Sequence, residues 1–390
     1  MSDSRTASLP RNVHVRKCAG RRRVGVHAAY VDLSTASATP IYIHALMHLE
    51  HASLDILGCL DCGGSLRLTA AATAPDAHVI TGTLTCGTCA REYPIVRGVP
   101  RMVPRQLARD VMATVDAFGY QWKQANAVLK DARFSAPEVF LDFIHPVEPA
   151  WFRDKIVLDG GCGIGRFTTA SSAFGARLAI GVDLSASVEV AFENTRHLPN
   201  VLIVQADILA LPLQRKIDYA FSVAVLHHTA DPRGAFLHMT TKVVPDGSVS
   251  AWVYGRENNG WIVHAINPMR RVTSRVPRPV LLVLAHLLAI PLTVITRGVY
   301  GPVARRPALR PLRAGLFYFD YMAFLAQFGY REHAFIVFDH AVPAIAEYIR
   351  REEFAAWFRD AGLKQVLITM RGGNSWRGFG LVPRDPHGAT

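Results

Sequence analysis

The chain has 390 residues, a formal net charge of +12, and 50% hydrophobic residues. This length fits two or three domains of ordinary size, and the hydrophobic content excludes a disordered chain. The charge is concentrated: residues 1–46 contribute +5, and residues 258–316, with nine arginines and no lysine or acid, contribute +9. The rest of the chain is close to neutral, which argues against a protein whose whole surface binds nucleic acid.

Residues 1–46 are rich in Ser, Ala, Arg and Thr and show no period, so we expect a basic, disordered tail. An alternative is that translation starts at Met47, because the organised pattern begins just after it. No signal-peptide pattern is visible in this segment. Four of the six cysteines form two close pairs, which favours metal binding in a reducing, cytoplasmic setting over a disulfide framework.

The two cysteine pairs lie in a predicted module at residues 47–104. Cys59 and Cys62 form one Cys-x2-Cys knuckle, Cys86 and Cys89 form the other, and 23 residues separate the pairs. Two such knuckles are typical of a tetrahedral Zn2+ site with four thiolate ligands. A site closed by four cysteines is structural, and in a module of about 50 residues the metal supplies much of the folding energy. Four unrelated buried cysteines are the alternative.

The residues around the two Cys-x2-Cys pairs resemble the small zinc-ribbon protein that partners and activates tRNA and translation-factor methyltransferases. The similarity covers about 50 residues and is most specific at Tyr93-Pro94-Ile95 and Gly98-Val99-Pro100. It implies a scaffold fused in cis to its own methyltransferase. Residues 105–150, which are mixed helical and polar, then read as a helical connector.

An alternating pattern follows in residues 151–257. Short β-rich runs are separated by segments of helix length, which is the signature of a parallel sheet with helices on both faces. The runs are residues 156–159, 178–183, 201–205, 217–223 and 248–254. Residues 331–390 continue the pattern with a helix at 349–362 and a closing antiparallel pair at 366–370 and 378–382.

The first of these runs ends in the motif Asp159-Gly160-Gly161-Cys162-Gly163-Ile164-Gly165. Its glycines allow a tight turn in which the backbone passes close to a ligand. The second run ends in Asp183, 18 residues after Gly165, where an acid can bind both hydroxyls of a ribose. The third run is followed by Asp207 and Ile208, where an acid and the adjacent backbone can read an adenine edge.

This combination resembles the class I S-adenosylmethionine (SAM) methyltransferases, in the type 11 branch. The resemblance implies an α/β fold with a Rossmann-like sheet, to which the zinc ribbon and a helical lid are added. It implies that Gly161, Gly163 and Gly165 contact the methionine part of SAM, Asp183 the ribose, and Asp207 with Ile208 the adenine. Asp159 would hold the loop and approach the amino group of SAM. The competing hypothesis, a dinucleotide dehydrogenase, is disfavoured because Asp159 would repel a pyrophosphate.

Methyl transfer from a sulfonium needs alignment and, for a hydroxyl acceptor, a base. His227 and His228, at the end of the fourth run, are candidates, and adjacent residues on extended backbone point to opposite sides. Asp339 and His340 form a second candidate pair. The sequence lacks an Asn/Asp-Pro-Pro-Tyr/Phe motif after the fourth run, which disfavours amine and amide acceptors. Cys162 sits in the glycine loop, which disfavours methylation through a cysteine adduct.

Residues 258–330 form an arginine-rich, apolar insertion. Residues 279–296 carry no formal charge, and arginines flank them on both sides. A buried helical lid over the acceptor pocket is one interpretation, and a lid that docks on an anionic membrane is the other. A full transmembrane span is disfavoured, because this run is slightly short and broken by Pro291.

We therefore expect a SAM-dependent methyltransferase that acts on a small-molecule or lipid-linked acceptor, at oxygen, with peripheral membrane contact possible and nucleic acid an unlikely partner. An RNA- or protein-directed methyltransferase is the alternative, because the zinc ribbon resembles a partner of such enzymes. A non-catalytic SAM-binding scaffold is a third possibility. Trp376 and Arg377 are expected to border the acceptor site.

Overall fold

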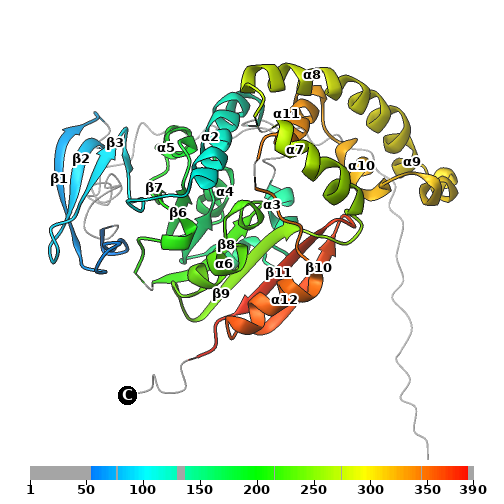
Figure 1. Ribbon diagram of the computed structural model, residues 1–390. Helices are drawn as coiled ribbons and strands as arrows, with labels where there is room; N and C mark the ends of the chain where they lie inside the picture. Colours follow the sequence, from blue (N-terminus) through cyan, green and yellow to red (C-terminus); the bar gives the residue numbers. More distant parts are fainter. Residues whose placement is uncertain are drawn as a thin grey trace, which may run out of the picture. The chain divides into compact units, whose positions relative to one another are not determined.

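A computed structural model describes residues 54–75, 78–129, 137–214, 216–273, 275–343 and 345–384 (Figure 1). The predicted tail at residues 1–46 lies outside these residues. Two sheets organise the described chain. The smaller one is antiparallel, with strand order β1-β2-β3-β4, and it contains or adjoins the four paired cysteines. Its strands are β1 (Leu66–Thr73), β2 (Val79–Cys86), β3 (Glu92–Val96) and β4 (Val99–Pro100).

The larger sheet has seven strands in the order β10-β11-β9-β8-β5-β6-β7. Neighbours from β9 to β7 are parallel, and β11 runs antiparallel to both β9 and β10. The strands are β5 (Ile156–Gly160), β6 (Leu178–Asp183), β7 (Val201–Gln205), β8 (Ile217–Val223), β9 (Val243–Tyr254), β10 (Lys364–Arg371) and β11 (Ser375–Leu381). This confirms the predicted Rossmann-like sheet with its closing antiparallel pair. Because β5 is central, the loop that follows it lies at the point where the strand order reverses, which is where open α/β sheets bind ligands.

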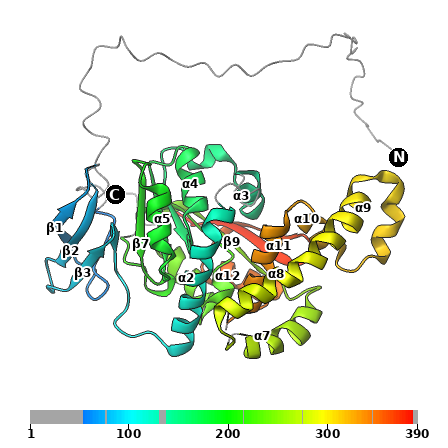
Figure 2. The same cartoon turned by 90° about the horizontal axis from the view of Figure 1, so that it is seen from above.

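Helices surround the large sheet (Figures 1 and 2). The α-helices are α2 (Arg109–Leu129), α3 (Pro137–Phe143), α4 (Arg166–Ala173), α5 (Ser187–Thr195), α6 (Pro232–Thr240), α7 (Asn267–Thr273), α8 (Arg278–Ile295), α9 (Gly301–Arg305), α10 (Phe319–Leu325), α11 (Tyr330–Ala341) and α12 (Arg351–Asp360). Shorter turns of helix are η3 (Pro149–Phe152), η4 (Ile208–Ala210), η5 (Leu226–His228), η6 (Ile262–Ile266), η7 (Thr296–Tyr300) and η8 (Pro307–Gly315).

Two hydrophobic cores lie on the two faces of the large sheet. One holds Phe236 of α6 and Trp357 of α12, and Tyr93 and Met102 of the cysteine-bearing module pack into the same cluster. The other gathers side chains of α3, α4 and α5, among them Phe140, Phe167 and Phe192. Burial of aromatic side chains on both faces is what a mostly parallel sheet requires. The cysteine-bearing module is therefore packed onto the larger domain and shares its core.

The arginine-rich insertion is helical. Its longest helix, α8, lies alongside α11 in both views, and Leu281 and Ala285 are buried there in a cluster with Phe338 (Figures 1 and 2). The opposite face of α8 exposes Val283, Leu287 and other aliphatic side chains. The helical stretch Arg278–Arg305 is long and apolar enough to cross a membrane by length and composition, and 22% of its most apolar window is buried. Membrane docking of this segment stays a prediction.

Some of the domain boundaries predicted from sequence lie between elements of secondary structure, and others lie within helices. The boundaries after residues 104 and 257 fall between elements of secondary structure. Those after residues 150 and 330 fall inside η3 and at the start of α11. The insertion is thus continuous with the helix that follows it, because α11 packs extensively against α8.

Candidate functional site

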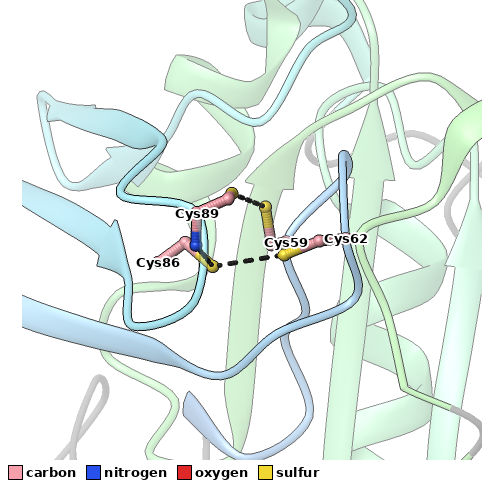
Figure 3. Close-up of side chains that lie close together, drawn as sticks. All are labelled: Cys59, Cys62, Cys86 and Cys89. Atoms are coloured by element: carbon pink, nitrogen blue, oxygen red, sulfur yellow. Dashed lines mark hydrogen bonds between the residues drawn. The ribbon is translucent and has the colours of Figure 1, made fainter.

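The four paired cysteines converge on one point (Figure 3). Their sulfur atoms all lie within 4.8 Å of one another, and Cys59 Sγ is 3.5 Å from Cys89 Sγ, as Cys62 Sγ is from Cys86 Sγ. Four thiolates at this spacing match the ligand set of a tetrahedral Zn2+ site. The predicted zinc-ribbon cluster is therefore confirmed as an arrangement of ligands.

The surroundings of Cys59 favour its thiolate form. Burial raises the pKa of this thiol, but hydrogen bonds from the Tyr93 hydroxyl and from the backbone of Cys62 and Asp61 outweigh it and lower the pKa to about 6. The distance from Cys59 Sγ to the Tyr93 hydroxyl is 3.2 Å. A thiolate is the form that binds zinc, so Tyr93 of the Tyr93-Pro94-Ile95 motif supports the ligand set from outside it.

The glycine loop after β5 leaves room for a ligand beside its backbone. Gly161 has φ +90°, and a Cβ atom there would lie 2.2 Å from Val225. Gly163 has φ +56°, and a Cβ atom there would lie 3.2 Å from Trp122. Both residues line a cavity of about 410 Å³, and larger side chains would fill that wall. The loop is thus a cradle of the kind that SAM would need.

Asp183 is tied to this loop from the end of β6. Its Oδ2 accepts the Gly163 N–H at 2.9 Å, and its Oδ1 accepts the Ser185 N–H at 2.8 Å and hydroxyl at 2.7 Å. Asp183 lines the cavity, as do Asp207 and Ile208 after β7. Burial raises the pKa of Asp207, whose carboxylate caps η4 by accepting the Leu209 N–H. The ends of β6 and β7 therefore present the residues predicted for ribose and adenine to the same cavity.

Asp159 and Gly165 are placed differently from the other predicted cofactor residues. Asp159 is buried behind the loop and absent from the cavity wall, and its Oδ2 accepts the Thr168 hydroxyl at 2.7 Å. Burial raises its pKa to about 7. Gly165, with φ +81°, sits at the N-cap of α4 and is likewise absent from the wall. Asp159 therefore fixes the loop to α4, and the structure does not bring it to the cavity surface.

The same cavity continues past the cofactor residues into a polar and aromatic end. Tyr254, Tyr318, Tyr321 and Arg371 line it, together with residues of α11. Its volume lies in the range of small-molecule sites, 300–1,000 Å³. A cofactor and a second molecule would therefore meet inside one enclosure.

The candidate histidines divide between this cavity and the core. His228 lines the cavity, and its Nδ1 lies 2.7 Å from the Ile345 carbonyl oxygen, so Nδ1 carries the proton and Nε2 keeps a free lone pair. His340 also lines it, with Nε2 3.2 Å from the Tyr321 hydroxyl. Burial lowers the pKa of both to about 4, so both are neutral at pH 7.

His227 does not line the cavity. It is fully buried, its ring centroid lies 4.0 Å from that of Tyr254, and burial lowers its pKa well below the usual value. Neither ring nitrogen has a hydrogen-bond partner among the described residues. Both histidines lie on η5, a turn of helix, and their ring centroids are 4.3 Å apart, so they do not point to opposite sides as expected for extended backbone. Of the two, His228 lines the cavity and His227 does not.

Asp339 lines the cavity beside His340 and is held by two neighbours. Its Oδ1 accepts a hydrogen bond from Gln121 Nε2 at 2.8 Å, and its Oδ2 accepts one from the Tyr254 hydroxyl at 3.4 Å. Trp376 and Arg377, by contrast, do not line the cavity: Trp376 donates to Glu257, and Arg377 pairs with Asp142. Arg371 and Asn374, a few residues earlier in the chain, line the cavity instead.

Sequence reasoning missed the contribution of α2. Phe118 and Trp122, one helical turn apart, line the cavity, and Trp122 lies against Gly163. The signal was present in Phe118-Gly119-Tyr120-Gln121-Trp122, where aromatic residues recur at i and i+4 inside a segment interpreted as a connector. Between them, a Cβ atom at Gly119 would lie 3.5 Å from the Ala186 backbone nitrogen, so this face of α2 packs closely on the start of α5.

Residues 158–251 match the family model described as a methyltransferase domain. The tRNA U34 carboxymethyltransferase of Ruthia magnifica subsp. Calyptogena magnifica is 34% identical over 83 residues, which are 20% of this chain and 26% of that protein. The protein of the same name from Psychromonas ingrahamii is 30% identical over 115 residues, 28% of this chain and 35% of that protein. The chain thus spans about a quarter to a third of the length of these curated relatives.

Two solved structures also show similarity. A complex between the Haloferax volcanii Trm112 methyltransferase activator and a methyltransferase gives a TM-score of 0.41 at 16% identity, covering 70% of this chain and 99% of that chain. A SAM-dependent methyltransferase from Aquifex aeolicus gives a TM-score of 0.38 at 13% identity, covering 67% of this chain and 98% of that chain.

The match to the methyltransferase-domain model confirms the resemblance of the cofactor region, and the names of the curated relatives correct one prediction. The expectation that nucleic acid is an unlikely partner is wrong, because the curated relatives are named as enzymes of tRNA. The expectation rested on the near-neutral charge outside two basic segments. That charge distribution excludes binding over the whole surface, but a single basic segment is enough to hold a phosphate backbone.

Proposed function

We propose an RNA as the acceptor of this SAM-dependent methyltransferase, with an oxygen atom of a nucleotide as the methylated group. The observation that carries the proposal is the shared cavity: the cofactor residues and a cluster of His, Asp and Tyr side chains line one enclosure. The names of the curated relatives support tRNA as the class of acceptor. A cytoplasmic setting fits both an RNA substrate and four reduced cysteines.

The residues that would hold SAM are those along the cofactor wall. Asp183 would bind the ribose hydroxyls, Asp207 and Ile208 the adenine, and the backbone of Gly161 and Gly163 the methionine part. SAM supplies an activated methyl group on a sulfonium, so the protein has to align the acceptor and exclude water. The aromatic rings of Phe118 and Trp122 on α2 would close the cavity over this wall.

His228 is the base that the geometry favours for a hydroxyl acceptor. Its Nδ1–H donates to the Ile345 carbonyl, which leaves Nε2 free to take the proton. Its low pKa keeps it neutral and able to accept at pH 7. Asp339 and His340, on the opposite helix, would receive polar groups of the acceptor. His227 would not contact the acceptor directly, because it is fully buried and does not line the cavity.

The acceptor end of the cavity fits a single nucleobase better than a helix. Trp252, Tyr254, Tyr318 and Tyr321 line it, and flat aromatic rings stack on bases. An enzyme that modifies a base takes it out of the stack and into such a pocket. Exposed arginines of the insertion supply positive charge for the phosphate backbone. They are Arg275, Arg297, Arg305, Arg306 and Arg310.

The four-cysteine cluster would hold one Zn2+ ion as a structural site. All four ligand positions are taken by thiolates, so the ion has no open position for substrate. It therefore contributes to folding of the N-terminal module and takes no direct part in methyl transfer.

The test uses the full-length protein, methyl-labelled SAM and a lysate from cells that lack this gene. The products are separated into RNA, protein, organic-extractable and small aqueous fractions. We expect label in the RNA fraction, sensitive to RNase and absent with Asp183→Ala. Digestion to nucleosides should then place the label on an oxygen atom.

Two outcomes would contradict the proposal. Label in the organic phase, unaffected by RNase, would assign a lipid-linked acceptor and link the exposed aliphatic face of α8 to it. Label that resists RNase and is released by protease would assign a protein acceptor. Because all fractions come from one reaction, the result selects among these acceptors without a second assay.

A further inference from the structure

The N-terminal module contacts the larger domain at two bridges, Leu57 with Leu213 and Arg101 with Gln205, and the second of these lies on the large sheet. Arg101, directly after β4, forms a parallel bridge with Gln205, the last residue of β7. The backbone N–H of Met102 donates to the Gln205 carbonyl at 2.8 Å. The contact thus lies at the carboxyl end of β7, which is the cofactor edge of the sheet.

The Arg101 side chain reinforces this joint from both sides. Its Nη1 donates to Gln205 Oε1 at 3.1 Å, and its Nη2 donates to Glu189 Oε1 on α5 at 3.0 Å. Only 13% of the side chain is exposed, so solvent screens these bonds less than it would at the surface. Arg97 reaches the other oxygen of Glu189 at 2.7 Å, but its side chain is 72% exposed and does not touch Gln205.

Gln205 also forms a hydrogen bond with the loop that follows Asp183. Its Nε2 donates to the Leu184 carbonyl at 2.9 Å. Gln205 is also the register partner of Asp183 across β6 and β7, and the next N–H, of Ala206, donates to the Asp183 carbonyl at 3.1 Å. Leu184, Ala206 and Asp207 all line the cavity. The Gln205 amide therefore ties together the two strand ends that carry the proposed ribose and adenine residues.

We propose that Arg101 is a positioning residue for SAM, which acts through Gln205 on the Asp183–Ser185 loop. The inference rests on the proposed function for the identity of the ligand only. Arg101 does not line the cavity, so its effect on SAM passes through its partners, and of these Gln205 bonds the cavity-lining Leu184. A planar guanidinium that bonds Gln205 and Glu189 at once fixes the amide orientation in which Nε2 faces Leu184.

This arrangement gives the cysteine cluster a consequence for the cofactor. Arg101 lies in a module whose fold depends on the cluster, and Met102 of the same segment is buried in the shared core. Loss of the module's fold would release Arg101, and with it the constraint on Gln205. The part of the site proposed to bind adenosine would then be less preorganised, and the cost of ordering it would reduce the binding affinity.

The test is cofactor binding, measured by calorimetry without any acceptor. Two ligands are used: S-adenosylhomocysteine, and methylthioadenosine, which lacks the amino-acid part. For Arg101→Ala we expect the Kd of both ligands to rise by the same factor, about tenfold, the scale of one hydrogen bond from a charged group. Arg97→Ala is the matched control and should change neither Kd, because it removes a bond to Glu189 and leaves Gln205 in place.

Two further variants, Arg101→Lys and Gln205→Glu, test whether the effect of Arg101 on SAM binding is transmitted through Gln205. A lysine can reach Gln205 or Glu189 but not both, so Arg101→Lys should restore part of the affinity. Gln205→Glu keeps an acceptor for Arg101 but loses the N–H that bonds Leu184, so it should weaken binding as Arg101→Ala does. Gln205 lies outside the N-terminal module, which keeps the test valid if Arg101→Ala disturbs that module.

Zinc content and the melting temperature are measured on every variant. The inference is overturned if Arg101→Ala and Gln205→Glu bind both ligands with wild-type Kd, or if only S-adenosylhomocysteine is affected. The second result would place the effect at the methionine side. If the wild-type protein binds neither ligand, the cofactor site and this inference both fail. A negative result for RNA methylation leaves the binding measurement intact, so the two failures are distinguishable.

Discussion

Gln121 on α2 donates a 2.8 Å hydrogen bond to Asp339 on α11, 218 residues further along the chain. Both helices lie outside the segment that matches the methyltransferase family. α2 supplies Phe118 and Trp122 to the cofactor wall, and α11 supplies Asp339 and His340 to the acceptor end. The hydrogen bond therefore links the helix over the cofactor to the helix beside the acceptor, and the site needs parts of the chain far from the glycine loop.

The first prediction concerns Asp183. Its carboxylate accepts three hydrogen bonds from Gly163 and Ser185, and it would also bind the ribose. Asp183→Ala should raise the Kd for S-adenosylhomocysteine by ~100-fold or more, because the loop loses its anchor and the ribose loses its acceptor. Calorimetry measures this directly. Asp183→Asn keeps one acceptor oxygen and should lose less, and equal Kd values for the two variants would contradict this explanation.

The second prediction separates the two adjacent histidines. His228→Ala should lower kcat by ~100-fold with an unchanged Kd for SAM, because the base is lost while the cofactor wall is intact. Single-turnover methylation of the RNA identified by fractionation provides the rate. His227→Asn is the matched variant one residue away. Because His227 is buried and does not line the cavity, that variant should reduce stability and leave the rate of the folded enzyme within a few-fold.

The pH dependence of the same reaction provides a further check on His228. Its pKa is about 4 in the folded protein, so the side chain is already neutral at pH 6 and gains no further basicity above it. The rate should therefore be flat between about pH 6 and pH 8 and decline only towards pH 4. A rate that rises tenfold per pH unit from pH 6 to pH 7 would assign the proton transfer to another group.

Site residues could be predicted from the sequence where the motif that marks them consists of neighbouring residues. Asp183 and Asp207 both line the cavity, and the sequence predicts that they lie together because strand, loop and acid are contiguous and a parallel sheet aligns the strand ends. Cys59, Cys62, Cys86 and Cys89 were identified because metal geometry fixes ligand spacing within each knuckle. Both patterns span only a few neighbouring residues, so both can be recognised in a single sequence.

The acceptor end was predicted only in part, because its residues meet through packing of distant helices. Asp339 and His340 were noted, but Gln121 and Tyr321 were not, since nothing local indicates that α2 and α10 converge on α11. Asp159 shows the opposite failure. The resemblance placed it at the cofactor, whereas its bond to Thr168 turns it into the core. Side-chain direction at a strand end depends on the helix that follows, and the strand pattern does not report it.

The third prediction concerns the cysteine cluster. Purified protein should contain one Zn2+ per chain, and removal of the metal by a chelator should lower the melting temperature by ~5 °C or more. Cys59→Ser should have the same effect, because it removes one of four ligands from a buried position. Elemental analysis and calorimetry measure the two quantities. Cys162→Ala, which removes a buried thiol away from the cluster, is the control and should retain the zinc.

The fourth prediction uses the raised pKa of Asp159. Burial raises this pKa from 3.8 to about 7, so between these values the folded protein holds a proton that the unfolded chain has released. The folded state binds more protons in this window, and the free energy of unfolding must therefore fall as the pH rises from about 4 to about 7. Above pH 7 both states are ionised and the contribution is constant.

Asp159→Asn isolates this effect, because asparagine resembles the protonated side chain and does not titrate. The buried histidines titrate equally in both proteins and cancel in the difference. Between pH 4 and pH 7 the wild type should lose roughly 2–4 kcal/mol of unfolding free energy relative to Asp159→Asn. Chemical denaturation at several pH values without cofactor measures it. Thr168→Val removes the hydroxyl that stabilises the carboxylate and so raises the folded-state pKa further, which should extend the decline to higher pH without moving its start near pH 4. Parallel curves for wild type and Asp159→Asn would show that folding does not raise the pKa of Asp159.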